Sequence, residues 1–100
     1  MKLEFHTGAI EELRRATKYY NSARQGLGVR FTEAVDEALQ QFRDNPRAGT
    51  PIARGQRRLN LKRFPYSVIV QVSEPQDLAI ILAVAHQKRK PGYWRRRLKA

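Results

Sequence analysis

The sequence predicts an α+β fold of order β-α-α-β-β-β, with a helix hairpin packed on one face of a small antiparallel sheet. Two observations support this prediction. Residues 8–44 show helical periodicity on both sides of one short break, and residues 58–85 show strand periodicity in runs separated by turns. The chain has 100 residues, a length that suits one domain, 1–100, around one core.

The N-terminal half is predicted to form one strand and two helices. In Lys2–His6 every second side chain is apolar, which indicates a half-buried strand. Thr7 is the expected N-cap of the first helix, and residues 21–28 are the expected break. The second helix should begin near Val29 and end at Asn45-Pro46. The predicted apolar stripes are Ile10, Leu13, Ala16 and Tyr20, followed by Phe31, Val35, Ala38, Leu39 and Phe42.

The C-terminal half is predicted to form three strands after a loop at 45–55 that is rich in Pro and Gly. Residues 58–62 and 66–72 alternate, and 78–85 are apolar on both faces, so the last run should be a central strand. Short turns between the runs indicate an antiparallel meander. The tail, 86–100, has seven basic residues and is expected to be mobile without a partner.

Composition excludes several classes of function. The chain has no cysteine, which removes disulfides, thiol catalysis and iron–sulfur clusters, and its two histidines lie 80 residues apart. We therefore expect no metal site and no cofactor. The longest apolar run has eight residues, too few to span a bilayer, and the N-terminus does not resemble a signal peptide. A soluble cytoplasmic protein without a membrane partner is expected.

The charge is concentrated in one half of the chain. The net charge is +11, and residues 51–100 contribute twelve basic and two acidic residues. Such an excess favours a polyanion or an acidic protein as the partner. The acidic residues are expected to be solvated on helix surfaces, which argues against hydrolysis by paired carboxylates.

The basic and aromatic residues of the second half are the candidates for function, and three chemistries suit them. They are phosphate-backbone binding, metal-free RNA cleavage by a proton donor or acceptor beside stabilising cations, and protein binding through an Arg and Trp hot spot. Structural roles stay open for two of them: His86 as a strand-end hydrogen-bonding residue and Trp94 as a cap on the core. The candidate binding residues are Arg58, Lys62, Lys88, Lys90, Trp94, Arg95, Arg96 and Arg97.

The sequence contains Phe5 followed by a helix, Tyr19-Tyr20, Leu27-Gly28 before Phe31, Asn45-Pro46, Arg63-Phe64-Pro65-Tyr66, and the ending Ala83-Val84-Ala85-His86-x-x-Arg89-x-Pro91-x-Tyr93-Trp94. Together these motifs resemble the RelE/ParE toxins of bacterial type II toxin–antitoxin modules. The resemblance spans nearly the whole chain. It implies a helix hairpin on a small antiparallel sheet, a growth-inhibiting activity, and a cognate antitoxin that silences the toxin with an acidic or amphipathic wrapping segment.

The resemblance also implies two mechanisms. RelE-like members cut mRNA in the ribosomal A site, whereas ParE-like members poison DNA gyrase and are not nucleases. Two arginines of the RelE-like catalytic set are replaced here by Ser67 and Gln87, which favours the gyrase mechanism. For the alternative, a ribosome-dependent mRNA endonuclease, the implied catalytic residues are His86, Arg89, Tyr93 and Arg63. A non-toxic nucleic-acid-binding module is a third, weaker hypothesis.

Overall fold

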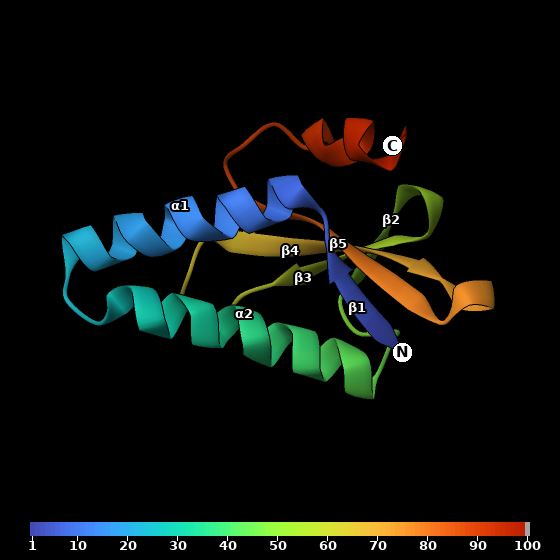
Figure 1. The fold of residues 1–100 in the computed structure, drawn as a ribbon, viewed down its shortest axis with the longest axis horizontal. Helices are drawn as coiled ribbons and strands as arrows, with labels where there is room; N and C mark the ends of the chain where they lie inside the picture. The colour runs from blue at the N-terminus through green and yellow to red at the C-terminus, as the bar shows by residue number, and fades with distance from the viewer. Residues whose placement is uncertain (100) are drawn as a thin grey trace.

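The computed structural model describes residues 1–99, with side chains through residue 97, and it confirms the α+β class. Two helices cover one face of a five-stranded sheet of order β1-β5-β4-β3-β2, and the C-terminal segment, residues 88–99, crosses to the side of α1 away from α2 (Figure 1). The elements are β1 (Lys2–Phe5), α1 (Thr7–Ala23), α2 (Leu27–Asp44), β2 (Thr50–Ile52), β3 (Gln56–Asn60), β4 (Tyr66–Ser73), β5 (Leu78–His86), and three 3-10 turns, η1 (Ala53–Gly55), η2 (Glu74–Gln76) and η3 (Tyr93–Lys99).

The sheet differs from the predicted antiparallel sheet in two respects: it contains one more strand, β2, and it is mixed, because β1 pairs parallel with β5. The expected loop at 45–55 contains β2, which pairs antiparallel with β3 at the sheet edge. Pro51 hides this strand from pattern analysis, yet an edge strand tolerates a residue without an N–H group. The meander β3-β4-β5 is antiparallel as predicted, and β5 is a central strand because β1 pairs parallel to its other side.

The ends of the helices also differ from the prediction. The N-cap of α1 is His6 rather than Thr7, because the imidazole Nδ1 accepts a hydrogen bond from Gly8 N at 3.0 Å. The break between the helices is shorter than expected, since α1 continues to Ala23. A side chain of α1 also caps α2: Asn21 Oδ1 accepts the Gly28 N–H of the first turn of α2 at 2.8 Å.

The main core lies between the helix hairpin and the sheet. Phe31, Val35 and Phe42 of α2 are at most 1% exposed and pack over Val68, Val70 and Ile81 of the central strands. At the hairpin end an aromatic cluster closes this core, with Tyr66 joining it to the ring of His86 at 5.0 Å. The other aromatic members of that cluster are Tyr20, Phe31 and Phe64.

A second, smaller core lies on the opposite face of the sheet. Trp94 of η3 is 6% exposed and packs on Ile69 and Leu82, together with Ala83 and Ala85. The expectation of a mobile tail is therefore wrong for the segment up to residue 97, because apolar burial holds it. Residue 100, the end of the predicted tail, lies outside the described residues. Among residues 1–99 no helix has both the length and the apolar character needed to cross a membrane.

Candidate functional site

A buried carboxylate connects α1 to the C-terminal segment. Glu12 lies in the second turn of α1, three residues after Ala9 and four before Ala16, and so shares their buried face. Its side chain is 8% exposed. The expectation that the acidic residues are solvated is wrong for Glu12, because its position places the carboxylate against the sheet.

Three side chains of the C-terminal segment converge on this carboxylate, at intervals of four residues. The Tyr93 hydroxyl donates to Glu12 Oε2 at 2.6 Å, and Arg97 donates to both carboxylate oxygens at 2.9 and 3.0 Å. Arg89 donates at 3.2 Å, and its guanidinium lies 3.8 Å from the centre of the Tyr93 ring. Gly8 allows this packing, because a Cβ atom there would lie 2.6 Å from Arg97 Cζ.

The same cluster provides hydrogen-bond partners for backbone groups of β5 that lie beyond the end of β1. β1 ends at Phe5, opposite Ile81, and a bulge leaves Leu82 without a partner in β4. Beyond that point Arg97 donates to Leu82 O at 2.7 Å, and Glu12 accepts the Val84 N–H at 3.0 Å. Side chains thus satisfy backbone groups that a longer β1 would otherwise have paired.

Burial and the hydrogen bonds to Glu12 set the protonation states of Glu12 and Tyr93. Burial alone would raise the pKa of Glu12, but hydrogen bonds from Arg97, Tyr93 and Val84 outweigh it, and the pKa lies below its usual value. Burial and the hydrogen bond to Glu12 raise the pKa of Tyr93 well above its ordinary value. At neutral pH the cluster therefore contains an ionised carboxylate and a protonated phenol that donates to it.

The lowered pKa of Glu12 predicts a pH dependence of folding. As the pH falls below about 5, Glu12 is protonated in the unfolded chain before it is protonated in the folded protein. The stability that the ionised Glu12 carboxylate gives the folded protein is therefore lost as the pH approaches its lower folded-state pKa. As the pH falls below about 5, we expect the free energy of unfolding of the wild type to fall more steeply than that of Glu12→Gln, because glutamine takes up no proton. Urea unfolding at a series of pH values measures this difference, and parallel pH profiles for the two proteins would contradict the prediction.

Trp94 anchors the segment a second time. Its Nε1 donates to Gln56 Oε1 at 3.0 Å, and Gln56 is 3% exposed at the start of β3. The indole thus fills an apolar site and satisfies a buried amide oxygen. This burial supports the interpretation of Trp94 as a cap on the core and removes the ring from solvent.

A polar cavity of about 290 Å³ lies between the open face of the sheet and the C-terminal segment. Arg58 of β3, His86 and Arg89 contribute positive or titratable groups to its wall. His86 Nδ1 accepts the Lys88 N–H at 3.0 Å, so a neutral ring carries its proton on Nε2. Ser67 donates to Asn60 Oδ1 at 2.6 Å on the same wall.

The structure separates the residues of the implied nuclease set. His86 and Arg89 line the cavity, whereas the Tyr93 hydroxyl is held by Glu12. Arg63 lies in the turn before β4 and lines a different depression, beside α2, together with Lys62. Lys62 itself pairs with Glu37 at 3.6 Å. The remaining predicted binding residues are exposed on the C-terminal segment, and these are Lys88, Lys90, Arg95 and Arg96.

Sequence reasoning missed Glu12 and Gln56, the two residues that hold the segment. A signal for Glu12 was present, because an acidic residue in phase with Ala9 and Ala16 interrupts an apolar stripe. No comparable signal marks Gln56, whose partner is 38 residues away. The described residues contain no group of three or more acidic or histidine side chains placed to share a metal ion.

The chain thus combines a helix hairpin on one face of the sheet with a basic segment anchored on the other face. Residues 3–91 match the family model described as "ParE toxin of type II toxin-antitoxin system, parDE". The chain belongs to this ParE toxin family, which confirms the resemblance drawn from its motifs.

Two solved structures share the fold. A chain of the chromosomal ParDE toxin–antitoxin system from P. aeruginosa matches with a TM-score of 0.72 at 22% identity, over 86% of this chain and 95% of that chain. The isolated E. coli RelE toxin matches with a TM-score of 0.66 at 18% identity, over 97% of this chain and 95% of that chain. No curated protein matches the sequence.

Proposed function

We propose that this ParE-family toxin inhibits DNA gyrase through protein contacts made by its basic C-terminal half. One observation carries the proposal: the Tyr93 hydroxyl, the tyrosine of the implied nuclease set, is bound by Glu12 at 2.6 Å. A protonated phenol that donates to a buried carboxylate is not available as a base for the 2′-hydroxyl of RNA. The segment's exposed cations remain available for a partner.

The residues at two other positions support the same mechanism. Ser67 and Gln87 stand where the resemblance expects catalytic arginines, and both make neutral contacts, with Asn60 and with Tyr66 O. A missing phosphate-stabilising cation costs roughly 3 kcal/mol of transition-state stabilisation. Two such losses would leave a nuclease slow.

The proposed partner is a cognate antitoxin that neutralises the toxin. The family is one of toxins of type II toxin–antitoxin systems, and the similar structure from P. aeruginosa is of a chromosomal ParDE toxin–antitoxin system. A wrapping segment that carries acidic side chains complements a chain of net charge +11.

A ribosome-dependent mRNA endonuclease is the alternative, and the cavity is the observation that favours it. Arg58, His86 and Arg89 meet around a space of about 290 Å³. In this alternative the protonated ring of His86 would donate its Nε2 proton to the leaving 5′ oxygen, water would take the proton of the attacking 2′-hydroxyl, and the arginines would stabilise phosphorane charge. Arg63 would have no part, since it lines another depression.

The first test combines two assays on the purified chain. In cell-free translation from pre-made mRNA, primer extension is expected to find intact message, while a supercoiling assay is expected to find gyrase inhibited. Tyr93→Phe should retain gyrase inhibition within a few-fold, because the ring and the Glu12–Arg97 pair remain. Ribosome-dependent, codon-phased cuts that disappear in His86→Ala would overturn the proposal and establish the alternative.

A further inference from the structure

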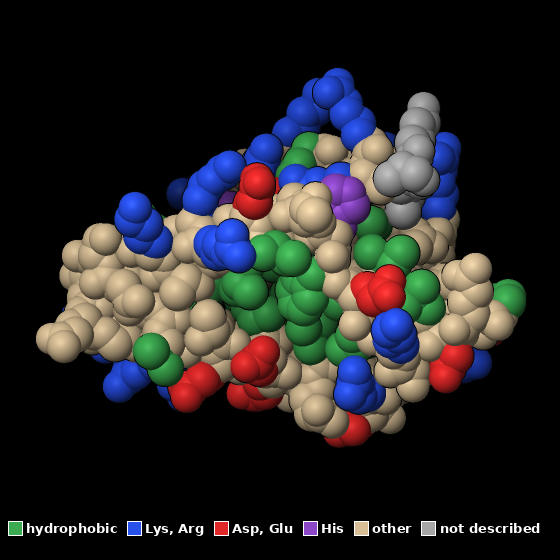
Figure 2. All heavy atoms as spheres, in the orientation of Figure 1, with side chains coloured by type: hydrophobic (Ala, Val, Ile, Leu, Met, Phe, Trp, Pro, Cys, Tyr) green, Lys and Arg blue, Asp and Glu red, His purple; other side chains and the backbone are tan. Residues whose placement is uncertain are grey.

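The fold segregates charge between two margins of the molecule. Helix α1 and residues 88–99 together contain ten basic and two acidic residues, whereas α2 contains four acidic and two basic residues. In Figure 2 many of the Lys and Arg side chains lie along the margin formed by α1 and the C-terminal segment, and most Asp and Glu side chains lie away from it. The sequence separates these two basic segments by more than 60 residues, and folding makes them neighbours.

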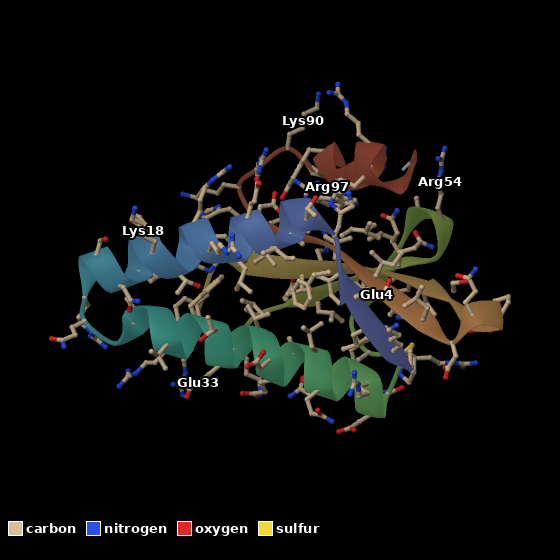
Figure 3. All side chains as sticks on the ribbon, viewed as in Figure 1. Glu4, Lys18, Glu33, Arg54, Lys90 and Arg97 are labelled. Carbon is tan, nitrogen blue, oxygen red and sulfur yellow. The ribbon has the colours of Figure 1, made fainter. Side chains whose placement is uncertain are left out.

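Arg89 is exposed but pairs with Glu12. The other exposed cations described in these two segments form what we call the cationic ridge: Arg14, Arg15 and Lys18 of α1 with Lys88, Lys90, Arg95 and Arg96 of the C-terminal segment. The Glu12 contacts with Tyr93 and Arg97 hold the two segments together. Lys18 and Lys90 extend from the same side of the molecule, and Glu33 of α2 extends from the opposite side (Figure 3). Within residues 1–97, Arg15 alone of the ridge makes an ion pair, with exposed Glu11 at 3.8 Å.

We propose that the cationic ridge binds the phosphate backbone of duplex DNA. Seven exposed cations beside one exposed carboxylate suit a row of phosphates, because each cation that neutralises a phosphate releases counterions from the duplex. Arg14 and Lys18 lie one helical turn apart, about 6 Å, a separation that allows contacts with neighbouring phosphates. Long flexible side chains that carry full charge at the surface bind a backbone without reading sequence.

This inference rests on the proposed function, since gyrase acts on duplex DNA, and it adds α1 to the surface that faces the target complex. The DNA-binding assay that tests the inference contains no gyrase, so the two proposals can fail separately. A toxin that binds DNA through the ridge and does not inhibit gyrase would contradict only the proposed function. A toxin that inhibits gyrase and does not bind DNA would contradict only the ridge.

The experiment is fluorescence anisotropy with a random-sequence duplex of about 20 base pairs, at salt concentrations from about 50 to 200 mM. Arg14→Ala/Lys18→Ala is expected to weaken binding at least about tenfold and to reduce the slope of log K against log salt by about 2. The matched control is Arg30→Ala/Arg43→Ala, which removes the same charge from exposed positions on α2. It is expected to bind within about twofold of the wild type.

Three outcomes would overturn the proposal. Equal weakening by both double variants would mean that net charge alone drives binding. Absence of binding at the lowest salt concentration would show that the cationic ridge does not bind duplex DNA. Binding at least about tenfold tighter to single-stranded RNA of the same length would assign the ridge to RNA instead. Because all four substituted side chains are exposed, circular dichroism is expected to show unchanged folding.

Discussion

Replacing Glu12 with alanine is expected to lower the free energy of unfolding by about 3–5 kcal/mol, because it removes one partner from a buried ion pair. Arg97, whose side chain is 19% exposed, would lose its carboxylate, and the buried Val84 N–H would lose its acceptor. A domain of this size has about 5–15 kcal/mol of stability in total, so the loss is a large fraction. Urea unfolding monitored by circular dichroism measures it.

Glu11→Ala is the matched control for this substitution. Glu11 precedes Glu12 in the same helix, but it is exposed and faces Arg15 at 3.8 Å. Its removal is expected to change stability by less than about 0.5 kcal/mol, the usual range for surface substitutions. If the two variants were equally stable, the carboxylate of Glu12 would have no anchoring role and the account of the C-terminal segment would fail.

The second large effect is expected from Trp94→Ala, at about 3–5 kcal/mol, because truncation of a buried aromatic side chain leaves a cavity. The substitution also leaves the Gln56 amide oxygen without its donor. Since the indole attaches the segment to the sheet, we expect a second result: faster proteolysis after the basic residues at 95–97. Limited trypsin digestion followed by mass spectrometry reads this directly.

Trp94→Phe separates packing from hydrogen bonding at this position. The phenyl ring retains most of the apolar contact with Ile69 and Leu82 and loses only the donor to Gln56. The expected cost is about 1–3 kcal/mol, the usual penalty for a buried acceptor left unsatisfied. Digestion of Trp94→Ala at the wild-type rate would show that the segment is held without the indole.

Much of the fold was predictable because local periodicity reports burial directly. The alternation at 66–72 and the doubly apolar run at 78–85 correctly identified β4 and the central strand β5, and the stripe through Phe31, Val35 and Phe42 identified α2. β2 was not predictable, because its three residues include a proline and pair only at an edge. An alternating pattern is recognised only over at least about four residues, and β2 has three.

The candidate site was predictable only in part. The sequence marked its basic residues and His86, and it marked the absence of two arginines at Ser67 and Gln87. It did not indicate that the tyrosine of the implied catalytic set would be engaged by Glu12, 81 residues earlier in the chain. That contact gives the Tyr93 hydroxyl a structural partner, and the proposed function rests on it.

Local pattern and residue identity therefore predicted both helices, the strands β1, β3, β4 and β5 and the basic character of the second half, and the resemblance of the motifs predicted the toxin family. The tertiary structure alone decided that the tail is docked, that α1 contributes to the basic surface, and that Glu12 is buried. The physical reason is that β1 ends before β5 does, which exposes backbone groups on β5. A carboxylate from α1 and a guanidinium from the C-terminal segment satisfy those groups, and this long-range pairing leaves no periodic trace in the sequence.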